Sequence, residues 1–211
     1  MELDMTRFAT KKKKKHHDES ESSEDDPQQQ HDEETFDFLA NGYWRDVWKV
    51  TDRNPGDAEE DLLIFKTQRW EHDFAPRNWD RHRRDAVAMD ELTGSKHIMD
   101  IYGFCGSASV DEFADGGDLN AALWPDDDDV VPWTPQERLV VGYQVVQALA
   151  AVHNHPKEGV PAIAHTDIQL GQYVYVSKVG GFKLQDFNRA RFLAWDEVED
   201  EACTYEVGNN P

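Results

Sequence analysis

A predicted β-hairpin with an aspartate at each end constrains the fold of this chain more than any other stretch. A loop over His165–Gln172 precedes strands over Tyr173–Val176 and Phe182–Leu184, so that Asp167 lies before the hairpin and Asp186 after it. Two such carboxylates can share the tasks of phosphoryl transfer: one orients a substrate hydroxyl, and the other holds Mg²⁺ against a triphosphate. Acidic residues are abundant here, and the pair alone is also compatible with ordinary solvated loop ends.

The charge of the chain limits the kinds of partner it can bind. The net charge is −21, which argues against binding nucleic acid through a basic surface, because phosphate neutralisation needs clustered Lys and Arg. The same net charge also disfavours binding of a nucleotide, whose phosphates are negative. However, charges farther apart than about 8 Å are largely screened at physiological salt, so a local lysine and a Mg²⁺ ion decide that question.

Length and cysteine content indicate a soluble protein of a reducing compartment, cytoplasmic or nuclear. The 211 residues suffice for one domain with a sizeable core, or for two small lobes. The two cysteines, Cys105 and Cys203, are too few and too distant for a disulfide framework or a zinc site. The sequence contains neither an apolar run long enough to span a membrane nor the apolar core of a signal peptide.

Residues 1–35 are predicted to be a disordered tail, because they contain almost nothing that could be buried in a core. The lysine run Lys11–Lys15 is compatible with nuclear import, with binding to an anionic surface, or with simple solvation. The folded part is therefore expected over 36–211. The acidic run Asp126–Asp129 is expected to be a solvated loop, since it lacks the alternating spacing of calcium loops.

Short strands are predicted in the first half of the folded part. Residues 38–50 alternate apolar and polar side chains around Asn41-Gly42, a dipeptide that favours a tight hairpin turn. Residues 62–66 form an apolar strand, in which a period of two places Ile64 and Lys66 on one face. A helix is expected over 83–92, strands near 98–104 and over 110–114, and a hinge over 115–118.

The longest predicted helix begins with Thr134-Pro135-Gln136-Glu137, a capping box with proline at the first helical position. His153 and His155 are interpreted as its end rather than as metal ligands. Residues after Trp195 are acidic and are expected to be irregular. An apolar stripe follows the helix in one line: Leu139, Tyr143, Val146, Leu149, Ala150 and His153.

Taken in order, these segments resemble the protein kinase fold from its first strand to the start of the activation loop, over residues 38 to about 195. Five stretches carry the resemblance in sequence order: Leu39-Ala40-Asn41-Gly42-Tyr43-Trp44-Arg45-Asp46-Val47 for the glycine-rich loop, Leu63-Ile64-Phe65-Lys66 for the lysine strand, Asp85 for the helix glutamate, Glu112-Phe113-Ala114 for the hinge, and His165-Thr166-Asp167 with Gln172 and Asp186-Phe187-Asn188 for the catalytic and metal-binding motifs.

The resemblance implies an α+β, two-lobed fold, with a small antiparallel β lobe carrying one helix (36–114) and the first part of a mainly helical lobe (115–211). It implies ATP and Mg²⁺ as cofactors. In that arrangement Lys66 holds the α- and β-phosphates while paired with Asp85, Asp167 orients the acceptor hydroxyl, and Asp186 with Gln172 binds the metal. The implied nucleotide contacts are Gly42, Val47, Ile64, Lys66, Asp85, Glu112 and Ala114.

Several positions depart from the family pattern. Arg45 replaces a loop glycine and either blocks the phosphates or clasps them, since a cation about 4 Å from a phosphate gains a few kcal/mol at an effective dielectric near 20. Asp85 is one methylene shorter than glutamate, and Gln172 one longer than asparagine, displacing each functional group by about 1 Å. Gln169 removes the catalytic-loop lysine, and Thr166 the arginine that pairs with a phosphorylated loop.

Three functions follow from the matches and the departures. The first is an ATP-dependent phosphotransferase of the protein kinase type that acts on a protein hydroxyl. The second is a pseudokinase that binds or scaffolds a protein partner, and the third a small-molecule kinase, since a His-x-Asp loop also occurs there. The larger lobe of the family continues beyond Pro211, so an incomplete lobe, with one face of the 134–153 helix left uncovered, is expected.

Overall fold

The computed structural model of the protein describes residues 35–52, 61–125, 132–196 and 198–203. The predicted tail up to residue 34, most of the loop over 51–60, the aspartate run Asp126–Asp129 and the chain after residue 203 lie outside the described residues. The predicted α+β class is confirmed, because a five-stranded antiparallel sheet is combined with a few helices.

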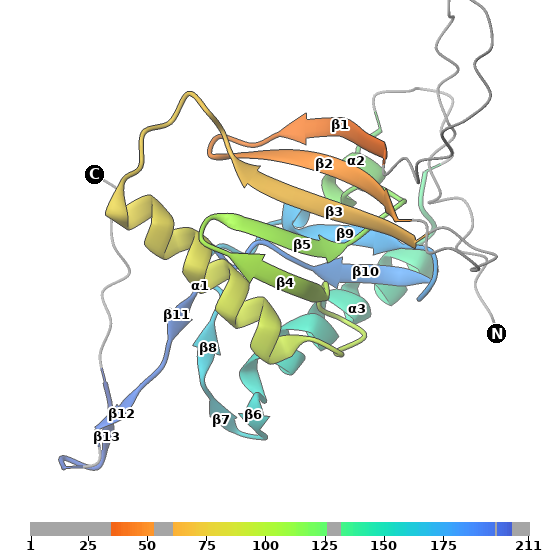
Figure 1. Ribbon diagram of the computed structural model, residues 1–211. Helices are drawn as coiled ribbons and strands as arrows, with labels where there is room; N and C mark the ends of the chain where they lie inside the picture. The colour runs from red at the N-terminus through yellow and green to blue at the C-terminus, as the bar shows by residue number, and fades with distance from the viewer. Residues whose placement is uncertain (1–34, 53–60, 126–131, 197, 204–211) are drawn as a thin grey trace, which may run out of the picture.

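The sheet is formed by β1 (Thr35–Asn41), β2 (Arg45–Asp52), β3 (Asp61–Gln68), β4 (Ile101–Cys105) and β5 (Ala108–Glu112). Its spatial order is β1-β2-β3-β5-β4, with every neighbouring pair antiparallel (Figure 1). The central position of β3 follows from its composition, since it carries the apolar run of this half of the chain. The sheet thus holds the predicted lysine strand between two neighbours.

The predicted hairpin around Asn41-Gly42 is present, but its turn differs from the expected one. Three residues, Gly42 to Trp44, connect β1 to β2, and the Gly42 N–H donates to the carbonyl of Arg45 at 2.9 Å. The wider turn carries Tyr43 and Trp44, whose rings meet edge to face with centroids 4.6 Å apart. Aromatic packing of this kind stabilises a turn beyond what the Asn-Gly dipeptide alone provides.

Helix α1 (Pro76–Leu92) begins seven residues before the predicted start at Arg83. Proline occupies the first helical turn, where its missing N–H costs nothing. The early turns were hidden in the sequence because they bury polar side chains, Asn78 and His82, on the face where the apolar period was sought. The helix runs beside the sheet and contacts β4 (Figure 1).

The second half of the described chain consists of short elements around one long helix. These are α2 (Leu119–Leu123), α3 (Pro135–His153), the 3₁₀ turn η2 (Leu170–Gln172) and the hairpin of β9 (Tyr173–Val176) with β10 (Gly181–Leu184). The hairpin agrees with the prediction to within one residue. Helix α3 packs against β10 (Figure 1).

Six further strands of two residues each form three small antiparallel pairs. The expectation of irregular structure after Trp195 was therefore wrong in part, since a short hairpin lies there. The pairs are β6 (Pro156–Lys157) with β7 (Val160–Pro161), β8 (Ile163–Ala164) with β11 (Arg191–Phe192), and β12 (Trp195–Asp196) with β13 (Glu201–Ala202).

The capping box of α3 is confirmed. The Glu137 N–H donates to Thr134 Oγ1 at 3.3 Å, and the Thr134 N–H donates to Glu137 Oε2 at 2.7 Å. The predicted apolar stripe, however, faces solvent, with Leu139 75% exposed and Tyr143 63% exposed. The side of α3 that packs against the core carries smaller residues and the capping glutamate: Glu137, Val141, Ala148 and Val152. One face of α3 is thus exposed in the described part of the chain.

The two predicted lobes share one hydrophobic core. Residues of α1, of α3 and of the β9–β10 hairpin belong to the same buried cluster. Backbone contacts join them as well, since Leu184 exchanges hydrogen bonds with His97 and Met99 at 2.8 and 3.0 Å. Within the described ranges, no helix combines the length and the apolar character that a membrane span needs.

Candidate active site

A cleft of about 490 Å³ lies between the five-stranded sheet and the segment that follows β10. The β1–β2 turn, β3, α1, the end of β5 and residues 185–188 all contribute to its walls. Seven of the sequence-predicted site residues line it: Gly42, Val47, Ile64, Lys66, Glu112, Ala114 and Asp186. Ile64 and Lys66 share one face of β3, in agreement with the period-two argument.

Lys66 forms an ion pair with Asp111, with Nζ and Oδ2 2.7 Å apart, and not the expected pair with Asp85. The reason is the register of the sheet. Ile64 lies opposite Asp111 on β5, so Lys66 and Asp111 are diagonal neighbours on one sheet face. Asp111 is 2% exposed and lines the cleft, and its Oδ1 has no hydrogen-bond partner in the described part of the chain.

Asp85 is held by Arg45 instead, with Nη2 and Oδ2 2.5 Å apart. Its other oxygen accepts the N–H of Phe187 at 2.6 Å, which ties α1 to the segment after β10. Burial by itself would raise the pKa of Asp85. The charges of Arg45 and Lys66, with these hydrogen bonds, outweigh burial and lower the pKa.

Arg45 is the residue that the sequence left undecided, and the structure gives it a partner within the protein. Burial lowers the pKa of Arg45, but the adjacent Asp85, followed by Asp186 and Asp111, outweighs that effect and raises it. Arg45 also lines the cleft. It thus holds α1 against the β1–β2 turn while keeping a positive charge at the cleft wall.

Asp186 reaches the cleft from a left-handed backbone conformation, with φ of 63°. Its Oδ1 accepts a hydrogen bond from the amide of Asn188, also a cleft residue. Burial, and next the charge of Asp85, raise the pKa of Asp186, while Arg45 and Lys66 act in the opposite direction. Such a carboxylate lacks compensating positive charge, and a cation beside it would relieve that deficit.

The loop of the predicted catalytic aspartate is joined to the Asp186 segment by hydrogen bonds. His165 contacts the carbonyl of Gln185 through Nε2 at 3.1 Å and accepts the Asp167 N–H through Nδ1 at 3.3 Å, an arrangement that requires the Nε2–H tautomer. Burial outweighs the neighbouring acids and lowers the pKa of His165, which keeps the ring neutral. Thr166, with φ of 61°, donates its hydroxyl to the Arg189 carbonyl at 2.6 Å.

Asp167 and Gln172 stand apart from the cleft residues. Asp167 pairs with Arg189 at 3.3 Å and is partly exposed. Gln172 is buried on η2 and its carbonyl accepts the N–H of Gln185 at 2.9 Å. Neither residue lines the 490 Å³ cleft, and neither does Asp85, which lies behind it.

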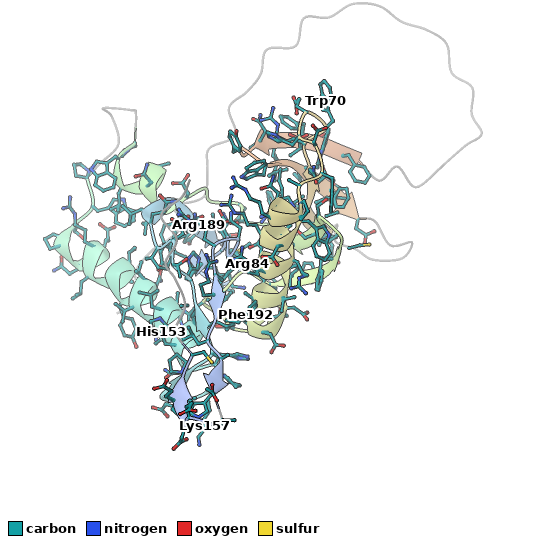
Figure 2. The ribbon with its side chains drawn as sticks, turned by 90° about the vertical axis from the view of Figure 1, so that its left-hand side faces the viewer. Trp70, Arg84, His153, Lys157, Arg189 and Phe192 are labelled. Atoms are coloured by element: carbon teal, nitrogen blue, oxygen red, sulfur yellow. The ribbon has the colours of Figure 1, made fainter. Side chains whose placement is uncertain are left out.

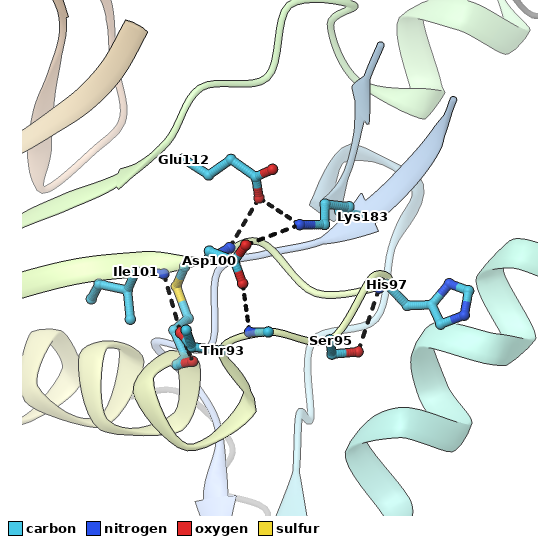
Figure 3. Close-up of polar contacts among 9 residues, drawn as sticks. Thr93, Ser95, His97, Asp100, Ile101, Glu112 and Lys183 are labelled. Atoms are coloured by element: carbon cyan, nitrogen blue, oxygen red, sulfur yellow. Dashed lines mark hydrogen bonds and ion pairs between the residues drawn. The ribbon is translucent and has the colours of Figure 1, made fainter. Parts of the chain in front are cut away.

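Glu112 is more firmly engaged than its predicted role in the hinge required. Its carboxylate lies 2.6 Å from the buried Lys183 Nζ and accepts the Asp100 N–H at 3.1 Å (Figure 3). Lys183 lies 3.5 Å from Asp100 as well. The Glu112 N–H donates to the Asp100 carbonyl at 2.9 Å. Because the Glu112 N–H already donates within the protein, it is not free to bind a ligand.

Around Asp186, the interacting carboxylates among the described residues outnumber the interacting cations. Arg45 and Lys66 face three carboxylates, those of Asp85, Asp111 and Asp186. A divalent cation would reverse the sign, and Mg²⁺ commonly takes one or two carboxylates together with phosphate oxygens. The residues fit a Mg²⁺ ion shared with a bound phosphate, held by Asp186. A site made by protein alone does not fit, since no group of three or more His, Cys, Asp or Glu in the described residues could hold a metal.

Three residues of the site were missed by sequence reasoning. Neither Asp111 nor Arg189 belongs to a sequence motif. The register between β3 and β5 places Asp111 near Lys66, and the path of the chain after β10 brings Arg189 to Asp167. His82 lines the cleft, is 5% exposed, and has no hydrogen-bond partner at Nδ1 among the described residues. A helix predicted from Pro76 instead of Arg83 would have placed His82 on its buried face.

Comparison with known proteins adds no relative to these observations. No protein-family model matches the chain, and no curated protein matches it. What the chain does must therefore be argued from its own cleft: Lys66 and Asp186 face that cleft, and Asp167 lies beside the segment that forms one of its walls.

Proposed function

We propose that the protein is an ATP-dependent phosphotransferase of the protein kinase type, which transfers the γ-phosphate of Mg²⁺-bound ATP to a protein hydroxyl. One observation carries the proposal. Seven residues that the sequence assigned to nucleotide binding or metal binding, from four separate segments, line a single cleft. Its volume of about 490 Å³ falls within the range of small-molecule sites, about 300–1,000 Å³.

Lys66 is the residue that would meet the α- and β-phosphates. It leaves Asp111 to do so, because a triphosphate with its metal offers more negative charge than a single carboxylate. Arg45 and Asp85 perform the structural task expected of a lysine–acid pair. Their 2.5 Å contact, with the Phe187 N–H on the same carboxylate, fixes α1 relative to Asp186.

Asp167 is the residue that would orient the acceptor hydroxyl. In the transfer, the bond between the γ-phosphorus and the bridging oxygen breaks, a bond to the acceptor oxygen forms, and the hydroxyl proton passes to a base such as Asp167. Mg²⁺, when bound, neutralises charge on the β- and γ-phosphates. The Asp167 carboxylate is positioned for this role by its N–H bond to His165 and by Arg189.

The test is Mg²⁺-dependent ATP turnover by the full chain and by the Asp186→Ala variant. Asp186→Ala removes the carboxylate that faces the cleft, so turnover is expected to fall at least 100-fold, the order found when a group stabilising a transition-state charge is lost. Asp90→Ala changes an exposed aspartate of α1 that does not line the cleft, so this variant serves as the matched control and should keep full turnover. Equal activity in all three proteins, or no activity in any, would sink the proposal.

A second candidate function is nucleotide binding without transfer, in a module that engages a protein partner. The Lys66–Asp111 pair favours it, because the phosphate-binding lysine is already neutralised. So does Gln172, which is buried outside the cleft. A thermal-shift titration with Mg²⁺ and ATP distinguishes the two candidates: stabilisation without release of ADP supports the binding module, and robust γ-phosphate transfer excludes it.

A further inference from the structure

Five arginines gather where α1 meets the segment after Asp186, and we propose that they bind the acidic flank of a peptide that carries the acceptor hydroxyl. We name them the arginine cluster: Arg77, Arg81 and Arg84 of α1, with Arg189 and Arg191. The proposal deepens the function above and rests on it, since it assigns the class of protein substrate: serine, threonine or tyrosine flanked by carboxylates.

Hydrogen bonds hold two members of the arginine cluster at one carbonyl oxygen. Arg84 Nη1 donates to the Ala190 carbonyl at 3.1 Å, and Arg191 Nη1 donates to the same oxygen at 3.3 Å. Two guanidinium groups that share one neutral acceptor repel each other, and the nearby Asp80 carboxylate offsets the charge of Arg84. Figure 2 shows Arg84 on α1 and Arg189 beside it, near the centre of the molecule. Carboxylates on a ligand would supply the missing charge, in the fork geometry that arginine favours.

The electrostatics of Arg81 agree with this geometry. Burial, and then the charges of Arg77, Arg189, Arg84 and Arg191, lower the pKa of Arg81. Arg81 also lines the cleft, so the positive field of the cluster extends to the nucleotide site. Two acids lie within the group: Asp80 pairs with Arg84 at 3.0 Å, and Asp167 pairs with Arg189 at 3.3 Å. Within the described residues, the five arginines of the cluster outnumber these two paired acids, in a chain whose net charge is −21.

The position of the arginine cluster connects it to the acceptor rather than to the nucleotide alone. Arg189 contacts Asp167, and the Thr166 hydroxyl holds the Arg189 carbonyl at 2.6 Å. A hydroxyl seated at Asp167 therefore has the cluster as its neighbour, within a few residues of extended chain, at about 3.3 Å per residue. The net negative charge of the chain repels an anionic peptide elsewhere on the surface, which favours binding at the arginine cluster.

A peptide fits this surface better than a nucleic acid does. Nucleic-acid affinity grows with the number of phosphates neutralised along a basic track, and a compact group of arginines in a strongly acidic chain offers few such contacts. A short acidic peptide needs only two or three carboxylate contacts. It leaves its remaining residues free to avoid the negative surface.

The test is fluorescence anisotropy with the full chain and three labelled peptides, in which a central serine is flanked by glutamates, by glutamines or by lysines. The glutamate peptide is expected to bind at least tenfold more tightly than the glutamine peptide, with a difference that shrinks at higher salt, and the lysine peptide least. The variant Arg77→Gln/Arg189→Gln changes two exposed members and should lose at least tenfold of the affinity for the glutamate peptide. Arg84→Gln, measured by the same assay after a thermal melt has shown that it folds, should lose a similar factor.

The matched control is Arg83→Gln. Arg83 lies on α1 next to Arg84, is 55% exposed at its side chain, and packs over the Trp79 ring at 5.6 Å, outside the cluster. Equal binding of the glutamate and glutamine peptides, wild-type affinity in Arg77→Gln/Arg189→Gln, or an equal loss in Arg83→Gln would overturn the proposal. The proposal would also be overturned if a single-stranded oligonucleotide bound more tightly than the glutamate peptide and Arg77→Gln/Arg189→Gln lost that binding.

The outcome for the peptide is separable from the outcome for catalysis. Glutamate-peptide binding that depends on the cluster, in a protein without ATP turnover, keeps the acidic-peptide site and removes the phosphotransferase. Turnover that does not distinguish acidic from neutral peptides keeps the phosphotransferase and removes the acidic-peptide site.

Discussion

Under the proposed function, Asp111 competes with a phosphate for Lys66. The two side chains form a pair inside the cleft, and Asp111 Oδ1 has no hydrogen-bond partner in the described part of the chain. A ligand phosphate must therefore replace a carboxylate that lies 2.7 Å from Lys66 Nζ. At the residue scale, one aspartate that no motif predicts opposes the residue on which the proposed function depends.

The Asp111→Asn variant is expected to bind Mg²⁺-ATP about tenfold more tightly than the wild type, a difference of about 1.4 kcal/mol. The amide keeps the shape of the side chain but removes the charge that holds Lys66. Isothermal titration of the full chain measures the change, and Lys66→Met should abolish the gain. An unchanged or weaker affinity in Asp111→Asn would contradict the inhibitory role of this pair.

His82 makes the stability of the protein depend on pH. Burial, and then the charge of Arg45, lower its pKa to about 4, despite the opposing charge of Asp85. Between pH 6.5 and 4 the unfolded chain therefore binds a proton at this position that the folded chain does not. The free energy of unfolding should fall as the pH drops through that window, by an amount on the order of 3 kcal/mol at its lower end.

The His82→Gln variant should show a weaker loss of stability between pH 6.5 and 4, because the group that titrates is gone. Burial lowers the pKa values of His97 and His165 also, so part of the slope will remain. Urea denaturation at a series of pH values measures the free energy of unfolding for both proteins. Identical slopes in the wild type and in His82→Gln would show that His82 is not the titrating group.

At the scale of elements, α3 depends on the cap at its N-terminus. Its exposed apolar face, with Leu139 and Tyr143, contributes little burial, so the capping box carries a larger share of its stability. Replacing an N-cap hydroxyl by alanine costs about 1 kcal/mol on average. Because α3 packs against β10, loss of the Thr134–Glu137 capping box should also weaken the packing of β10.

We expect Thr134→Ala to lower the free energy of unfolding by about 1 kcal/mol, and Thr134→Ser to leave it within about 0.3 kcal/mol of the wild type. Serine keeps the oxygen that accepts the Glu137 N–H, whereas alanine removes it. Chemical denaturation measures all three proteins. An equal loss in both variants would mean that the threonine methyl group, and not the hydrogen bond, is the source of the effect.

At the scale of the whole molecule, the buried Lys183 joins the sheet to the β9–β10 hairpin. It lies on β10 and contacts two carboxylates of the first half of the chain, Glu112 at 2.6 Å and Asp100 at 3.5 Å (Figure 3). Asp100 in turn accepts the Gly94 N–H at 2.7 Å, which extends the network to the end of α1. The cleft lies between the parts that this network holds together.

Lys183→Ala should therefore destabilise the full chain by about 3–5 kcal/mol, since it leaves two carboxylates without their buried cation. The exposed Lys178→Ala, in the turn of the same hairpin, is the matched control and should change the free energy of unfolding by less than about 0.5 kcal/mol. Thermal and urea unfolding measure both. A loss of less than about 1 kcal/mol in Lys183→Ala would show that the two halves hold together without this network.

Local signals determined much of the fold. Period two placed Ile64 and Lys66 on one face, the Thr134–Glu137 signature marked the start of α3, and turn residues marked the β9–β10 hairpin, because each depends on neighbours within a few positions. The start of α1 escaped the same reasoning, since its buried face carries the polar Asn78 and His82. The direction of the α3 stripe also escaped it, because an amphipathic pattern does not specify which face finds a partner.

The sequence by itself determined which residues could share a site, and the tertiary structure decided which of them touch. Lys66, Asp85 and Asp186 follow from motif order, but the pairs Lys66–Asp111 and Arg45–Asp85 depend on the register between β3 and β5 and on the position of α1. Charge pairing acts over a few ångströms and across forty or more residues of chain, as Arg45 and Asp85 show. Only the folded backbone sets such distances, and so only it could show that Lys66 has Asp111 beside it.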